Sequence, residues 1–179
     1  FPTVEEADIF KKLNINYFSC VPPYNQEAAR EALENPLSKQ AVEKMVDTFE
    51  SRRNLIWSQI SKIPGISCQK PGGAFYLFPN ISAVCENLDL INKHQRLSPE
   101  EQSSPANLFQ MFSLYEHQVA VLDRNSFGQI GTDGKHFLRL SIAAEQSVLE
   151  EGVRRIKAAA EDVSGLDKFL KKRPDLNLF

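Results

Sequence analysis

The stretch HFLRLSIA, from His136 to Ala143, places a single arginine, Arg139, inside a run of strand-forming apolar residues. In a strand, successive side chains point to opposite faces of the sheet. One face, which we predict to be the core face, carries Leu138, Leu140 and Ile142. The other carries Phe137, Arg139 and Ser141. If that second face is exposed to solvent, Arg139 is an ordinary surface arginine. If it lines a cleft, the planar guanidinium is suited to bind a carboxylate through two parallel hydrogen bonds.

A second informative stretch is KPGGAFYLFPN, from Lys70 to Asn80. Gly72-Gly73 favours a tight turn, because glycine tolerates backbone conformations closed to other residues. A phosphate cradle would need further glycines and a following Lys-Ser/Thr, which are absent. From the residues alone, Phe75 and Tyr76 are expected in the core. They would lie in a strand from Ala74 to Phe78 that is covered on both faces.

The remaining pattern predicts helices joined by turns and short strands. Helices are expected at Val4–Leu13, Asn25–Glu34, Ala106–Tyr115, Gln146–Glu161 and Leu166–Lys172. A strand is expected at Val119–Leu122, and Ser82–Ser104 is the most loop-like stretch. Few strands without regular alternation with helices indicate the α+β class: a small antiparallel or mixed sheet covered by helices.

The strongest predicted helix begins with Ser38 as its N-cap and runs to about Ile63. Apolar residues recur along it at helical spacing and form one stripe. The stripe consists of Val42, Met45, Val46, Phe49, Ile56, Ile60 and Ile63. We therefore expect a long surface helix that packs on a large partner.

Composition narrows the functional classes. The chain has 179 residues, of which 42% are hydrophobic and 25% charged, as in soluble globular proteins. The formal net charge of -2 gives no electrostatic reason to expect nucleic acid or an anionic membrane as a partner. No apolar run approaches the length of a membrane span. Three scattered cysteines favour a reducing, cytoplasmic setting over a disulfide framework. The three histidines lack metal-ligand spacing, so no zinc site is expected.

Taken in order, several segments together are similar to a known family. They are the long helix, PGGAFY at 71–76, QVAV at 118–121, SFG at 126–128 and FLRLS at 137–141. From about residue 4 to about residue 163, the chain resembles the C-terminal portion of class I/II aminotransferases. These are fold type I enzymes that use pyridoxal 5'-phosphate (PLP), and the resemblance is to the aspartate-aminotransferase-like subgroup.

The resemblance implies a function for two residues. Arg139 would bind the substrate α-carboxylate, and Phe75 would lie at the edge of the active site. Residues 1–36 would be the tail of the large PLP-binding domain, and residues 37–179 the small C-terminal domain. The complete protein would be a cytoplasmic homodimer that transfers an amino group between an amino acid and a 2-oxo acid.

The chain begins at Phe1 and not at methionine, so we expect a fragment or a processed chain. By the resemblance, the lysine that forms the Schiff base with PLP and the arginine that holds its phosphate lie upstream. Neither has a match here. PLP would be bound mainly by those upstream residues, and no catalytic residue is expected in this chain. The 179 residues alone should therefore not transaminate.

Two departures from the family pattern stand out. Leu122-Asp123-Arg124 replaces the proline and glycine that usually follow the strand at Val121. The stretch Ile15–Ser19 lacks the arginine that some aspartate-specific members supply there.

Two rival interpretations remain. One is the effector-sensing, aminotransferase-like domain of a bacterial transcription regulator. The other is a non-catalytic interaction domain, in which Arg139 would meet only solvent or a structural carboxylate.

Overall fold

The computed structural model describes residues 1–97, 103–128, 132–173 and 176. The chain divides into two compact units, Phe1–Val46 and Asp47–Phe179. The first contains α1 (Val4–Phe18), α2 (Pro23–Glu34) and the start of α3 (Pro36–Ile60). The division at residue 36 that the sequence suggested stays a prediction. No helix in the described ranges is long and apolar enough to cross a membrane.

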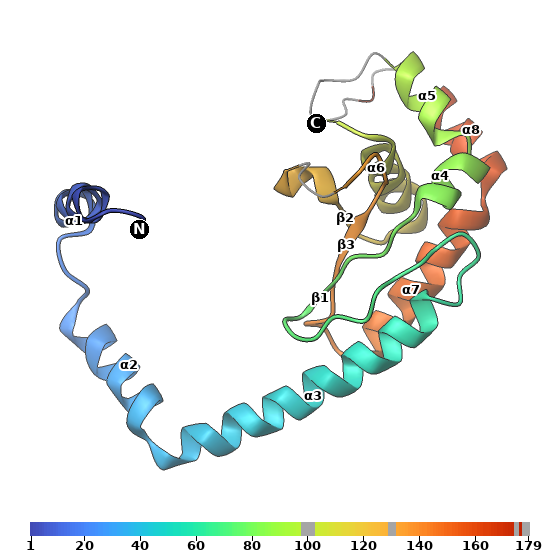
Figure 1. Ribbon diagram of the computed structural model, residues 1–179. Coiled ribbons are helices and arrows are strands. Elements are labelled where there is room, and N and C mark those ends of the chain that lie inside the picture. Colours follow the sequence, from blue (N-terminus) through green and yellow to red (C-terminus); the bar gives the residue numbers. More distant parts are fainter. Residues whose placement is uncertain (98–102, 129–131, 174–175, 177–179) are drawn as a thin grey trace. The chain divides into compact units, whose positions relative to one another are not determined.

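The elements of the second unit follow α3 in chain order (Figure 1). They are β1 (Tyr76–Leu77), α4 (Ser82–Asn87), α5 (Leu90–Arg96), α6 (Pro105–His117), β2 (Leu122–Asp123), the 3-10 helix η1 (Arg124–Phe127), β3 (Leu138–Ser141), α7 (Gln146–Glu161) and α8 (Val163–Lys172).

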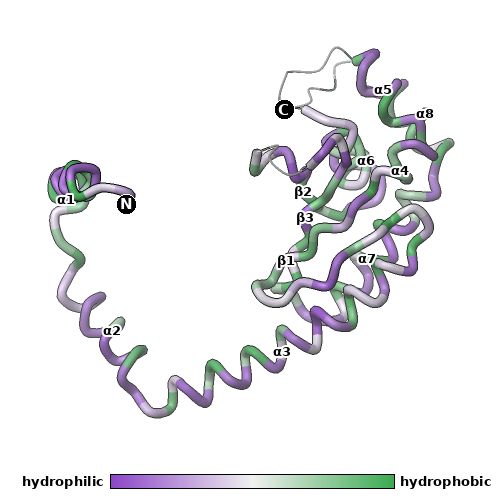
Figure 2. The backbone as a smooth tube through the Cα atoms, in the orientation of Figure 1, coloured by the Kyte–Doolittle hydropathy of each residue, from purple (hydrophilic) through white to green (hydrophobic). Residues whose placement is uncertain are grey.

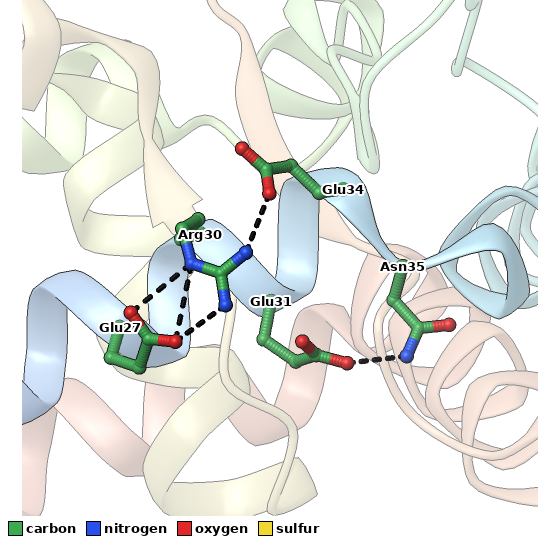
Figure 3. Close-up of polar contacts among 5 residues, drawn as sticks. All are labelled: Glu27, Arg30, Glu31, Glu34 and Asn35. Atoms are coloured by element: carbon green, nitrogen blue, oxygen red, sulfur yellow. Dashed lines mark hydrogen bonds and ion pairs between the residues drawn. The ribbon is translucent and has the colours of Figure 1, made fainter.

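Local side-chain contacts support the two helices of the first unit, a cap in α1 and ion pairs in α2. Thr3 and Glu6 form a capping box at the start of α1, which extends beyond the predicted end at Leu13. On α2, Arg30 pairs with Glu27 on one side and Glu34 on the other, at 2.5 and 2.7 Å (Figure 3). These exposed pairs support the helix only modestly.

The start of α3 differs from the prediction. The helix begins at Pro36 and not after Ser38. Proline suits the first helical position, where its missing N–H costs nothing. Asn35 Oδ1 accepts the backbone N–H of Leu37 at 2.8 Å, so Asn35 provides the cap that was assigned to Ser38.

Only the C-terminal part of the α3 stripe is buried. Ile56, Ile60 and Ile63 are 3%, 0% and 4% exposed. Val42, Met45 and Val46 are about half exposed, at 50–52%. The expected partner for that part of the stripe is therefore not supplied by the described residues.

The sheet of the second unit is antiparallel with the order β1-β3-β2. Tyr76 pairs with Ser141, and Leu122 pairs with Arg139. Directly paired residues share a face, so the register separates two faces. The buried face carries Leu77, Asp123, Leu138 and Leu140, all no more than 8% exposed. The more open face carries Tyr76, Leu122, Arg139 and Ser141. The face assignment predicted for β3 is thus confirmed, and Ile142 is buried as expected.

Helix α6 is the centre of the helical layer. It contacts α4, α5, α7, α8 and β2, and Figure 1 shows these helices gathered beside the sheet. Phe109 and Phe112 are completely buried on it. The α+β class with a small antiparallel sheet is confirmed.

Three predicted elements were wrong in part. The strand predicted at Ala74–Phe78 is reduced to β1, in which Leu77 is buried and Tyr76 lies on the open face of the sheet. The flanking Phe75 and Phe78 are 41% and 40% exposed. The stretch from Ser82 that was predicted to be loop-like forms α4 and α5, which bury Val84 and Leu90, and Leu88 between them is also buried. Residues 98–102 of this stretch lie outside the described residues. The strand predicted at Val119–Leu122 is shifted to β2.

Candidate carboxylate site around Arg139

Arg139 lies in the middle of β3 on the open face of the sheet, and its side chain is half-buried. Two aromatic rings flank its guanidinium. The guanidinium carbon lies over the Tyr76 ring, 4.5 Å from its centre, and over the Phe127 ring, 4.0 Å from its centre. Tyr76 comes from β1 and Phe127 from η1, so residues distant in sequence form one aromatic enclosure. A cation over a ring face is attracted by the π electrons.

The guanidinium has no acidic partner in the described parts of the chain. Within residues 1–97, 103–128 and 132–173, the side chain of Arg139 makes no hydrogen bond and no ion pair. Other arginines of this unit do: Arg53 contacts Glu50 at 2.6 Å, and Arg155 contacts Glu151 at 2.7 Å. The N–H donors of Arg139 therefore remain available for an anion, and a planar carboxylate matches their geometry.

Phe75 lies one ring away from the guanidinium. Its ring centre is 4.4 Å from that of Tyr76 and 6.1 Å from that of Phe49 on α3. The expectation that Phe75 is a core residue was wrong, because 41% of the residue is exposed. The Phe75 ring packs against the Tyr76 ring. Among the described residues, Phe75 makes no ring–cation contact with Arg139.

The glycine pair Gly72-Gly73 lies in the bend that precedes β1. Residues 72–75 bend the chain, as predicted. The left-handed conformation in this turn falls on Ala74, with φ of 60°, and not on the glycines. A Cβ added at Gly72 or Gly73 would meet nothing within 4 Å, so nothing in the described fold requires glycine there for space.

A groove of about 520 Å³ lies elsewhere in the second unit, between α7 and residues 118–120. Its charged side chains are already paired: Arg155 contacts Glu151 and donates to the Gln118 carbonyl at 2.9 Å. Hydrogen bonds from Arg154 and Arg155 lower the pKa of Glu151 to about 2. Arg139 is not in the lining of this groove. Within the described residues the guanidinium of Arg139 is unpaired, so Arg139 and not the groove marks the better site for an anionic ligand.

No family model matches the chain. The protein named "Probable aspartate/prephenate aminotransferase" of Aquifex aeolicus is 40% identical over 159 residues, which is 89% of this chain and 35% of that protein. The aspartate aminotransferase of Sulfolobus acidocaldarius is 30% identical over 156 residues, 86% of this chain and 34% of its own length. The crystal structure of the aromatic aminotransferase from Pyrococcus horikoshii is 29% identical, with a TM-score of 0.63 over 90% of this chain and 35% of that chain.

The chain belongs to the family of fold type I aminotransferases. It spans about a third of the length of the curated relatives that it matches. The structure of the PLP-bound C-S lyase from Staphylococcus hominis is 18% identical, with a TM-score of 0.64, and shows that the same fold is shared more widely.

In this aminotransferase-family chain, the departure at Leu122-Asp123-Arg124 has a structural explanation. The Asp123 side chain is 2% exposed and caps η1, since its Oδ1 accepts the N–H of Asn125 at 3.0 Å. Its Oδ2 accepts the hydroxyl of Ser104 at 2.6 Å. Asp123 therefore fixes the turn that carries Phe127 to Arg139.

Sequence reasoning missed a buried polar cluster beside this turn. His94 Nε2 lies 2.7 Å from the Ser103 hydroxyl, and both residues are 9% exposed. Burial lowers the pKa of His94, and the nearby His136 lowers it further. Burial raises the pKa of the Cys85 thiol to about 12, so this cysteine is not a nucleophile at neutral pH. No local spacing in the sequence signals the cluster, because its members come from separate elements.

Among the described residues, no group of three or more His, Cys, Asp or Glu side chains is arranged to hold a metal ion.

Proposed function

We propose that the protein containing this chain is a PLP-dependent aminotransferase that transfers an amino group between an amino acid and a 2-oxo acid. In this proposal Arg139 binds the substrate α-carboxylate, and Phe75 supports the edge of the site. One observation carries it: in a chain of this family, an arginine on an open sheet face is flanked by two rings and has no acidic partner among the described residues.

The chemistry follows from the shape of the guanidinium. Two parallel N–H donors grip both carboxylate oxygens and so fix the orientation of the attached α-carbon as well as its position. The neighbouring rings exclude water from part of the guanidinium, which strengthens the ion pair. Arg139 therefore orients the Cα–H bond of the substrate and does not itself move a proton.

The residues around Arg139 fit a carboxylate and not the anchoring groups of PLP. PLP, when bound, withdraws electrons from the substrate α-carbon. The described neighbours Tyr76, Leu122 and Phe127 offer neither an amine for its aldehyde nor a second cation for its phosphate. We infer that PLP is held mainly by residues outside these 179, and that the chain by itself does not transaminate.

The wider assembly is proposed on the same grounds. Residues 1–36 would belong to the tail of a large PLP-binding domain and residues 37–179 to the small domain. The complete enzyme would act as a cytoplasmic homodimer. A transcription regulator with the same domain remains the rival, but none of the relatives named above is a regulator, and no observation favours it.

The test uses the complete protein, expressed with PLP and assayed against a panel of amino acids. Arg139→Lys keeps the positive charge but loses the planar guanidinium with its two parallel N–H donors. We expect it to raise KM and lower kcat/KM by about 1.5–3 kcal/mol of transition-state binding, with PLP still bound. Arg96→Lys, an exposed arginine on α5, is the control and should leave both constants unchanged. Unaltered amino-acid kinetics in Arg139→Lys would refute the assignment, and failure of every amino acid to react would favour the regulator.

A further inference from the structure

We propose that Phe127, held over Arg139 by the turn that Asp123 caps, is a positioning residue for carboxylate binding. The inference rests on the proposed role of Arg139. It adds a residue in η1 that does not itself touch the reacting atoms but sets the geometry of the group that holds the carboxylate.

The first argument is the place of the Phe127 ring. Phe127 is 48% exposed, so it does not serve the hydrophobic core. It is nevertheless held 4.0 Å from the guanidinium carbon, closer than Tyr76 at 4.5 Å. A half-exposed phenylalanine that covers a cation is better explained by that contact than by packing.

The second argument is how firmly the turn is fixed. The buried Asp123 carboxylate accepts the N–H of Asn125 and the hydroxyl of Ser104. The N–H of Gly128 donates to the Asn125 carbonyl at 3.0 Å, and Arg124 donates to the Gly128 carbonyl. The Phe127 ring is thus carried by a turn that is closed at both ends.

The third argument is that the turn follows a strand, β2, that pairs with the strand carrying the arginine, β3. Asp123 pairs with Leu138, the residue before Arg139, and the N–H of Arg124 donates to the Phe137 carbonyl at 3.0 Å. The position of Phe127 relative to Arg139 is therefore set by backbone pairing at Phe137 and Leu138, the two residues that precede the arginine.

The consequence is preorganisation. Arginine has many rotamers, and binding a ligand normally requires ordering them. Rings over the guanidinium, Tyr76 from β1 and Phe127 from η1, restrict those rotamers before the ligand arrives. Without the Phe127 ring, the Arg139 side chain would be less ordered before the ligand binds. Because Arg139 contacts the carboxylate in both the ground state and the transition state, binding in both states should weaken alike.

The test measures Phe127→Leu and Phe127→Tyr in the complete protein. Calorimetry with succinate and with 3-phenylpropionate, which lack an amino group, reports carboxylate affinity without turnover. Steady-state kinetics with the preferred amino donor supply KM and kcat. We expect Phe127→Leu to weaken carboxylate binding and raise KM about 5- to 10-fold with kcat changed less than about twofold, while Phe127→Tyr restores both.

Phe78→Leu is the matched control. Phe78 is also about half exposed, at 40%, and makes no contact with the guanidinium among the described residues. Its substitution should leave carboxylate affinity unchanged. Equal losses in Phe78→Leu and Phe127→Leu, or wild-type affinity and KM in Phe127→Leu, would overturn the inference.

Arg139→Ala separates the two proposals. If Arg139→Ala binds the carboxylates and the amino donor as the wild type does, the proposed role of Arg139 falls, and this inference with it. If Arg139→Ala loses binding while Phe127→Leu does not, only the positioning role of Phe127 falls.

Discussion

Arg139 and Arg155, both in the second unit, differ in what surrounds them. Arg155 on α7 pairs with Glu151, a carboxylate whose pKa is lowered to about 2 by its hydrogen bonds to Arg154 and Arg155. Arg139 meets rings and, within the described residues, no carboxylate. The difference is one of surroundings and not of residue type. The paired Arg155 supports its own helix, whereas Arg139, which faces rings among the described residues, keeps its N–H donors available for the proposed carboxylate.

His94 gives a prediction at the same scale. Burial lowers its pKa below the ordinary value of 6.5. As pH falls below about 6.5, the unfolded chain binds protons before the folded chain does, so the free energy of unfolding should fall. We expect α5 to lose hydrogen-exchange protection between pH 7 and pH 5 in the complete protein, after correction for the intrinsic exchange rate.

His94→Gln should flatten this pH dependence, although His136, whose pKa burial also lowers, will retain part of it. His117→Gln, at the C-terminal end of α6, is the control and should leave the pH dependence of exchange in α5 unchanged. A profile for His94→Gln that matches the wild type would show that another group controls the opening.

At the scale of elements, α6 connects the core to the site. Its buried face fills the centre of the helical layer with Leu108, Phe109 and Phe112, each 0% exposed. Its N-cap, Ser104, accepts the N–H groups of Ala106 and Asn107. The same hydroxyl donates to Asp123, so the Ser104 side chain both caps α6 and supports the residue that caps η1.

Ser104→Ala should therefore destabilise more than the loss of an ordinary cap. The cap contributes about 1 kcal/mol, and a buried carboxylate that loses a donor costs a further 1–3 kcal/mol or so, giving about 2–4 kcal/mol for the free energy of opening α6. Hydrogen exchange of α6 amides in the complete protein measures this.

Ser113→Ala offers a control on the same helix. Ser113 is fully buried, and its hydroxyl has no hydrogen-bond partner in the described part of the chain. Its removal should change the opening free energy by about 1 kcal/mol or less. Equal effects of the two substitutions would show that the Asp123 contact adds nothing.

At the scale of the whole molecule, the two units differ in what stabilises them. The second has a continuous core to which α3, α6, α7 and α8 contribute. The first has no buried residue in α1 or α2, and apolar side chains such as Ile9, Phe10 and Leu33 are 57%, 49% and 85% exposed. Figure 2 shows apolar stretches, in green, along these helices. Helices of 15 and 12 residues that bury no side chain are marginal in water.

The 179-residue chain alone should therefore show uneven protection. We expect amides of α1 and α2 to exchange within about tenfold of the unfolded rate, while those of α6 are protected far more strongly. In the complete protein, α1 and α2 should gain protection if other residues cover their apolar sides. Strong protection of α1 in the isolated chain would contradict the expectation that local structure alone holds it.

The sequence by itself determined the features that depend on local periodicity. Alternation along the strand separates the two faces of β3. Helical spacing and the residues that stop a helix give the bounds of α7 at Gln146–Glu161 and the end of α2 at Glu34. The family resemblance followed from the order of such segments. Arg139 could be named as the candidate residue for the same reason, because an arginine in a strand of apolar residues is visible in the sequence.

Tertiary structure alone decided what surrounds Arg139. Tyr76 and Phe127 contact the guanidinium because strand pairing and a capped turn bring distant segments together. Tertiary structure also decided that Phe75 is exposed and that His94 meets Ser103. Such contacts depend on which segments pack together, and the pattern of residues along one segment does not record that choice.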